Sequence, residues 1–347
     1  MKYSLKIGSA WGIPIELHVT FILLMIAVFV LTYPELYFFA LMLLLFVFVV
    51  AHELSHSLVA RHYKIKVRKI VLYPIGGVSE IEEIPENPRI EWRMAIAGPL
   101  SSFGIGLVLL GLNLAVPVAV AGTIYGSFTL DLASLNIFLG AFNLIPAFPM
   151  DGGRVFRALL AERVKFSDAT KYAAFIGRFL GIVMVFFGIF NFWLVVIGVF
   201  IYIGASEEAE QTIVSTTMAR VRVKDVMYPE VAVVKPETTL ADALEVMFKA
   251  KYHDILVEKD GAFHGVVTWA EIMKVKPEQR SEFKVEQIPA RQVSVFSDES
   301  ILEAYKIMSR ERIDLVPVVD RAEPTKVVGV VTGESVSYAI EKAKSLR

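Results

Sequence analysis

The sequence contains no cysteine among its 347 residues. This absence excludes disulfide bonds and metal sites built on thiolates, so a metal ion bound by this chain must be held by His, Asp or Glu. An excess of one charge is also missing, because 35 basic residues nearly balance 36 acidic residues. The net charge of −1 offers no basic surface, and we expect no nucleic-acid partner.

Charged residues are scarce, at 20% of the sequence, whereas apolar residues make up 55%. A helix needs about 20 apolar residues to cross the ~30 Å hydrocarbon core of a bilayer. The apolar runs predict six such helices, and thus a polytopic α-helical membrane domain, before a water-soluble tail. The predicted spans are residues 17–33, 36–60, 94–115, 128–147, 171–190 and 191–206. Only Asn191 separates the last two, so a single kinked helix is the alternative there.

Basic residues lie on alternate sides of the predicted spans. Lys2 and Lys6 precede the first span, whereas the 33–36 turn and the 116–127 loop contain neither Lys nor Arg. Two basic clusters follow the second and fourth spans: Arg61, Lys64, Lys66, Arg68 and Lys69, and then Arg154, Arg157, Arg163, Lys165 and Lys171. Because Lys and Arg concentrate in cytoplasmic loops, we expect a multi-pass protein of the cell membrane with both termini in the cytosol.

Three ionisable residues, His52, Glu53 and His56, lie near the end of the second predicted span. Each is costly inside a membrane unless it is paired, so their grouping indicates function. Residues four apart share one face of a helix, and two neutral imidazoles there can bind one zinc ion. Glu53 is then placed to take a proton from a zinc-bound water, as in other His-Glu-x-x-His sites. The alternative is a chance match in which the histidines form hydrogen bonds between helices.

A catalytic zinc usually has three protein ligands and one open position. Asp151, in the segment GAFNLIPAFPMDGG at 140–153, is the best candidate for the third ligand. It follows the fourth span at the membrane level of the two histidines, and the prolines and glycines around it break the helix. Irregular backbone at that depth is tolerated where it lines a wet cavity. The alternatives are that Asp151 only caps a helix, or that the ligand is Asp131, which lies near the opposite membrane face.

These motifs resemble those of the site-2 proteases, which are intramembrane zinc metalloproteases, and in particular the prokaryotic branch with a CBS-domain tail. The similar segments are GIPIELHVTF at 12–21, HELSH at 52–56, Gly-Gly at 76–77, Ala-Gly-Pro at 97–99 and NLIPAFPMDGG at 143–153. Their order and spacing agree with that family over nearly the whole chain.

The resemblance implies specific roles for the residues of the site. His52, His56 and Asp151 would bind one Zn²⁺ per chain, and Glu53 would act as the catalytic base. Asn143 would contact the scissile peptide or its developing oxyanion, a role that suits an amide donor. For Asn143, a hydrogen bond between helices is the alternative.

Residues 67–84 contain alternating β-branched side chains around a Gly-Gly turn, which predicts a short β-hairpin beside the site. An extended substrate peptide could add a strand to the edge of this hairpin. A plain connecting hairpin is equally compatible with the sequence.

The tail contains an internal repeat. TLADALEVMFKAKYHDILVE at 239–258 matches SILEAYKIMSRERIDLVPVV at 300–319, and GVVTWAE at 265–271 matches GVVTGES at 329–335. Each copy predicts strand, helix, strand, strand and helix, and the two copies resemble a pair of CBS domains. We therefore expect a soluble α/β CBS pair in the tail.

The predicted domain organisation has three parts. A transmembrane metalloprotease domain covers residues 1–206, and a linker covers residues 207–219. The cytosolic CBS pair covers residues 220–347, with its copies at 220–277 and 284–344.

Many CBS pairs bind an adenine nucleotide such as ATP in the cleft between their copies. The ligand signal of that family, Gly-x-x-Thr-x-x-Asp, implies that Thr268 and Glu271 of the first copy and Thr332 of the second bind the nucleotide. Glu271 stands in place of Asp, and the second copy has Ser335 where the acid is expected. The alternative is a packing or homodimerisation module without a ligand.

The leading prediction is an enzyme that hydrolyses a peptide bond within or beside the transmembrane segment of its substrate. Its partners would be the lipid bilayer and a single-span or membrane-anchored protein, and nucleotide binding to the tail would regulate access. A CBS-regulated transporter is the main alternative, but it would favour polar residues near the midplane of several spans. An inactive protease relative is the second alternative, although it would have no need of Glu53.

Overall fold

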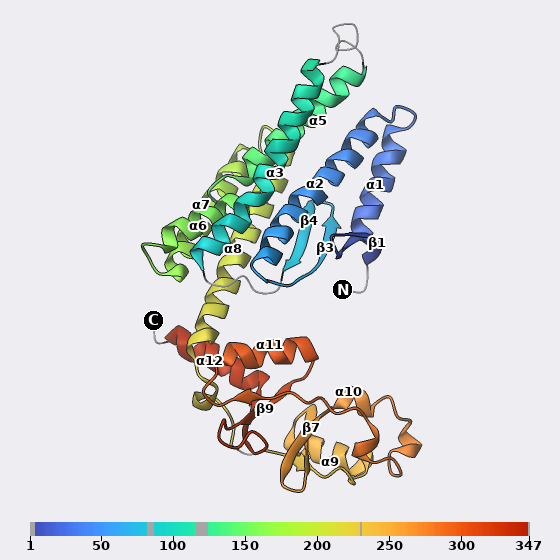
Figure 1. Ribbon diagram of the computed structural model, residues 1–347, viewed down its shortest axis with the longest axis vertical. Helices are drawn as coiled ribbons and strands as arrows, with labels where there is room; N and C mark the ends of the chain where they lie inside the picture. Colours follow the sequence, from blue (N-terminus) through green and yellow to red (C-terminus); the bar gives the residue numbers. More distant parts are fainter. Residues whose placement is uncertain (1–3, 82–86, 116–123, 230, 346–347) are drawn as a thin grey trace. The chain divides into compact units, whose positions relative to one another are not determined.

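The computed structural model describes residues 4–81, 87–115, 124–229 and 231–345. The chain forms two compact units, Met1–Glu210 and Gln211–Arg347 (Figure 1). The first is helical with one small sheet, and the second is α/β, so the predicted fold class is confirmed. Lys2, used to predict the orientation, lies outside the described residues, as do residues 82–84 of the predicted hairpin.

Among the described residues, the helices of the first unit overlap the predicted apolar runs, except for the helix that starts at Asp151, which was not predicted. They are α1 (Val19–Thr32), α2 (Tyr37–His62), α3 (Pro88–Ala115), α5 (Ile124–Asn143), α6 (Asp151–Ala161), α7 (Phe166–Phe187) and α8 (Phe192–Arg220). Among the described residues, α2, α3, α7 and α8 are long and apolar enough to span a membrane, and α1 is a shorter apolar helix.

The boundaries differ from the predicted ones at several points. The alternative of one kinked helix at the end of the domain is wrong, because α7 and α8 are separate helices. The first span starts at Val19 rather than at residue 17, since the preceding residues belong to a strand. Helix α8 continues without a break to Arg220, so residues 207–219, the predicted linker, are helical.

The small sheet has two strands more than the sequence predicted. The predicted hairpin forms strands β3 (Val67–Tyr73) and β4 (Gly76–Ile81). Strands β1 (Ser4–Ala10) and β2 (Ile13–His18) extend it, in the order β1-β2-β3-β4, and β2 pairs with β3 in parallel. Strand β4 is therefore an edge of this sheet, and the sheet packs beside α2 (Figure 1).

Helix α3 packs against α2, α5 and α6 and connects the parts of the first unit. Its buried residues include Gly98, Ser102 and Gly106, whose small side chains allow a close approach of neighbouring helices. A Cβ added to Gly106 would lie 2.7 Å from Ile137 of α5, so the two helices are in contact there.

The second unit has two similar halves, as the repeat predicted. The first half has β5 (Val233–Val234), α9 (Leu240–Ala250), β6 (Asp254–Lys259), β7 (Ala262–Thr268) and α10 (Trp269–Ile272). The second half has β8 (Val295–Phe296), α11 (Ile301–Glu311), β9 (Leu315–Val319), β10 (Val327–Thr332) and α12 (Gly333–Ser345). Each half has its own sheet and its own apolar core. A third cluster, with Leu256, Leu315 and Val330, joins the two halves.

Candidate metal centre

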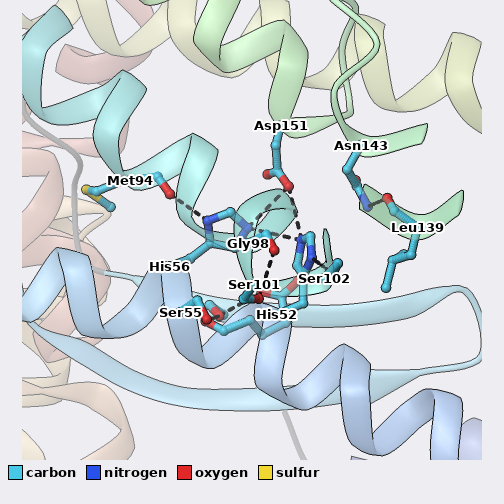
Figure 2. A network of polar contacts seen from close by, with 12 residues as sticks. His52, Ser55, His56, Met94, Gly98, Ser101, Ser102, Leu139, Asn143 and Asp151 are labelled. Carbon is cyan, nitrogen blue, oxygen red and sulfur yellow. Dashed lines mark hydrogen bonds and ion pairs between the residues drawn. The ribbon is translucent and has the colours of Figure 1, made fainter. Parts of the chain in front are cut away.

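Three potential ligands meet where α2, α3 and α6 come together (Figure 2). His52 and His56 lie one turn apart on α2 and are buried, with 4% and 8% of their surface exposed. Asp151 is the first residue of α6. Its Oδ2 atom lies 3.1 Å from His52 Nε2 and 3.2 Å from His56 Nε2, and the two Nε2 atoms are 3.2 Å apart.

This near-equilateral triangle fits one zinc ion. Ligand atoms at 2.0–2.1 Å from a tetrahedral zinc are separated from one another by about 3.3 Å. The three measured separations, 3.1 to 3.2 Å, are close to this value. Three protein ligands leave a fourth position for water or substrate, which is the usual arrangement of a catalytic zinc site.

The second ring nitrogen of each histidine contacts α3. His56 Nδ1 lies 2.7 Å from the Met94 carbonyl oxygen, and His52 Nδ1 lies 2.9 Å from Ser102 Oγ. A carbonyl oxygen can only accept, so His56 donates from Nδ1 and its neutral form carries a free electron pair on Nε2. The tautomer that metal binding requires is thus set by the backbone of α3.

Two positions in the motifs shared with the family require glycine, because neighbouring side chains of the site approach their backbone closely. A Cβ added to Gly98 would lie 2.2 Å from His56 Nε2 and 2.5 Å from His52 Nε2. Any other residue there would displace the ligand atoms themselves. A Cβ added to Gly77 of β4 would lie 2.5 Å from Glu53 Cγ. Glycine at these positions keeps the ligands and the acidic side chain in place.

The Glu53 carboxylate is oriented by the edge strand β4. Ser79 Oγ donates a hydrogen bond to Glu53 Oε2 at 2.8 Å, and Ser57 Oγ lies 3.2 Å from Ser79 Oγ. The sequence reasoning missed Ser79, as it missed Met94 and Ser102. Their only signal was closeness in sequence to the Gly-Gly and Ala-Gly-Pro segments, which does not show where a side chain points.

Comparison with known proteins identifies the family of the chain. The profile of Peptidase family M50 matches residues 39–121 and 113–184, and that of the CBS domain matches residues 223–278 and 285–342. A zinc metalloprotease of Methanocaldococcus jannaschii is 38% identical over 344 residues, which cover 98% of this chain and 97% of that protein. The chain belongs to the site-2 protease family, peptidase family M50.

Two further relatives extend the comparison. Rip3 of Mycobacterium tuberculosis is 30% identical over 310 residues, which cover 84% of this chain and 77% of that protein. The solved site-2 protease from Methanocaldococcus jannaschii is 43% identical, covers 60% of this chain and 95% of its own, and gives a TM-score of 0.47. The M50 profile and the relative that is 38% identical show that the present chain is a zinc metalloprotease, and the CBS profile shows its two CBS domains. These findings set the transporter alternative aside.

The two remaining candidate residues of the membrane domain are Asn143 and Asp131, and only Asn143 lies near the metal centre of this site-2 protease. Asn143 ends α5 on the Asp151 side of the site, and its amide donates to the Leu139 carbonyl of its own helix at 3.0 Å (Figure 2). Asp131 accepts a hydrogen bond from Tyr37 Oη at 2.7 Å, at the start of α2. Tyr37 precedes His52 by 15 residues, or about 22 Å along the helix, so Asp131 is not a ligand of this site.

The residues predicted for nucleotide binding lie at helix starts in the two CBS domains. Thr268 caps α10, and its Oγ1 accepts a hydrogen bond from the Glu271 amide at 3.2 Å. Glu271 pairs with Lys274 at 2.6 Å. In the second copy, the Thr332 amide donates to Ser335 Oγ at 3.2 Å. Each side chain therefore has a local structural partner, and Ser335 takes part in a cap where an acid was expected.

Proposed function

We propose that this site-2 protease is an intramembrane endopeptidase, which cleaves a peptide bond within or beside the transmembrane segment of a membrane-protein substrate. The observation that carries the proposal is the triangle that the half-buried Asp151 forms with His52 and His56, which are buried near the end of an apolar helix. His56 precedes the end of α2 by six residues, about 9 Å along the helix axis. The reaction would take place inside the bilayer, close to one face.

The residues of the chain divide the chemistry among them. A zinc ion held by the triangle would lower the pKa of a bound water and polarise the carbonyl of the substrate. Glu53 follows the first ligand directly in sequence, and Ser79 holds its Oε2 atom. We assign to Glu53 Oε1 the removal of the water proton and its delivery to the leaving amine.

Asn143 would contribute the oxyanion contact. Its side-chain amide donates a hydrogen bond to the Leu139 carbonyl, one turn earlier in α5. A rotation of the side chain exchanges this contact for one to the developing oxyanion, where a neutral donor stabilises negative charge. In this proposal, the hydrogen bond to Leu139 is the resting position of the side chain.

An extended substrate segment would bind along β4. This strand is an edge of the sheet, and its Ser79 and Gly77 both contact Glu53. An edge strand offers unpaired backbone groups, and a peptide that adds to it becomes extended, as cleavage requires. A helical substrate would unwind locally as it binds.

The topology and the tail complete the proposal. The distribution of Lys and Arg supports cytosolic termini in a multi-pass protein of the cell membrane, with water reaching the site from the cytosol. We further propose that the CBS pair binds an adenine nucleotide through Thr268, Glu271 and Thr332, and that this binding regulates cleavage. Pairing of two copies through the CBS domains is the alternative role of the tail.

Zinc content and cleavage together test the proposal. The wild type, purified in detergent, is expected to hold about one zinc per chain and to cleave a membrane-protein substrate. Asp151→Ala is expected to lose most of the zinc, and Glu53→Gln to keep it without turnover. A metal-replete wild type without zinc would refute the metal site. Turnover retained by Glu53→Gln would refute the assignment of the base.

A further inference from the structure

Helix α3 is the common support of both histidines. The Met94 carbonyl and Ser102 Oγ, both on this helix, contact the outer ring nitrogens of His56 and His52. One turn before Met94, α3 carries Glu91, a carboxylate of which only 1% is exposed. This buried acid has no role in the proposed chemistry, and a buried carboxylate needs a partner that compensates its charge.

The partner of Glu91 is Arg157, on the helix that begins with Asp151. Arg157 Nε donates to Glu91 Oε1 at 2.8 Å, and its Nη2 donates to the same oxygen. Nη2 also lies 3.5 Å from Glu208 Oε1 on α8. The guanidinium group lies 4.9 Å from the ring centroid of Phe148, which is fully buried in the loop that leads to Asp151.

This arrangement fixes the start of α6. Arg157 follows Asp151 by six residues, or about 9 Å of rigid helix. The N-cap residue, Met150, provides no side-chain hydrogen bond to the first turn. The backbone hydrogen bond from Gly153 N–H to the Met150 carbonyl supports the first turn. Farther along the helix, Arg157 adds contacts to α3, to α8 and to the preceding loop.

Chemistry explains why an arginine suits this position. A buried charge is stable only with well-placed partners, and the loss of one partner is strongly destabilising. The planar guanidinium group donates in fixed directions and stacks on an aromatic ring, which a lysine cannot reproduce. The orientation of α6 is thus tied to the same helix that orients the histidines.

We propose that Arg157 is a positioning residue, which sets Asp151 at the correct distance from His52 and His56 by pairing with Glu91. Helix α3 thereby orients the two histidines directly and Asp151 through the pair of Glu91 and Arg157. Glu208 connects α8 to this pair. The inference rests on the proposed function, since it assumes that the triangle binds zinc.

The test compares zinc affinity in four full-length proteins purified in detergent. Arg157→Lys and Glu91→Gln are each expected to weaken zinc binding about tenfold in a chelator competition, within the range known for residues behind metal ligands. Tyr37→Phe, which removes a contact between α2 and α5 at the other end of the domain, is expected to bind zinc as the wild type does. Saturating zinc should restore most of kcat in the two variants, with KM unchanged.

A double variant shows whether the two residues act as a pair. Arg157→Lys combined with Glu91→Gln is expected to weaken zinc binding no more than either change alone, because both remove one interaction. The inference would be overturned if the losses of zinc affinity in the two single variants multiplied in the double variant. It would also be overturned if the single variants bound zinc as tightly as Tyr37→Phe does. Lower thermal stability with unchanged zinc affinity would also overturn it, since that is the result of a structural role alone. If the wild type binds no zinc, the proposed function itself fails.

Discussion

Replacement of Gly98 by alanine should destroy the metal site without unfolding the protein. The added Cβ would lie 2.2 Å from His56 Nε2 and 2.5 Å from His52 Nε2, whereas carbon and nitrogen atoms in contact are normally about 3.5 Å apart. Each imidazole must therefore move its ligand atom by about 1 Å, while zinc ligands tolerate only about ±0.2 Å. Two of the three bonds to the metal would be lost.

The expected result is a large loss of zinc with the helix intact. We expect Gly98→Ala to hold less than about a tenth of the wild-type zinc and to lose at least ~100-fold in activity, since a displacement of about 1 Å has such an effect. Zinc per chain, measured by atomic spectroscopy on the detergent-purified protein, is the assay.

Helix α3 offers a matched control for this substitution. Gly104 and Gly111 lie on the same helix, and a Cβ at either position meets no atom within 4 Å. Gly104→Ala is expected to keep its zinc and to gain about 0.5–1 kcal/mol in stability, the usual effect of Gly→Ala inside a helix. A Gly98→Ala protein with one zinc at wild-type affinity would show that the approach of α3 to the histidines is not as close as described.

Two further predictions concern other parts of the chain. Ser79→Ala should keep the zinc but lower kcat about tenfold, because Glu53 loses the hydrogen bond that orients it, and a kcat equal to that of the wild type would contradict this role. In the tail, burial raises the pKa of Asp254 to about 6, so the folded state binds a proton more tightly than the unfolded state does. The stability of the tail should then fall by at most about 3 kcal/mol as the pH rises from about 4 to 6, and Asp254→Asn should remove this slope. Hydrogen exchange of the tail amides in the whole protein, at pH 4.5 and 7, measures the difference, and an equal slope in both proteins would refute it.

Local patterns account for what the sequence predicted well. The apolar runs predicted α2, α3, α7 and α8, because a helix needs about 20 apolar residues to cross a bilayer and such a run is visible in the sequence. The pair of His52 and His56 was predictable because the spacing of a helix places residues four apart on one face. The hairpin at β3 and β4 followed from alternation around a turn.

Long-range pairing accounts for what the sequence reasoning missed. Strands β1 and β2 have no strong pattern of their own, and they form because β2 pairs with β3, more than 50 residues later in the chain. Helix α8 extends beyond its apolar part, so its end could not be predicted from hydropathy. For Ser79, the side chain gains a function only when β4 packs beside α2.

The sequence by itself determined the kind of protein and most of its chemistry: an apolar helical domain, a His-Glu-x-x-His motif, and a tail of two similar copies. Only the tertiary structure decided that Asp151 joins His52 and His56, at 3.1 and 3.2 Å, and that Gly98 leaves room for the ligand atoms of the two histidines. The physical reason is the separation along the chain between the residues that come into contact. Spacing within one helix is fixed by local backbone geometry, whereas contact between residues about 100 positions apart depends on how α2, α3 and α6 pack together.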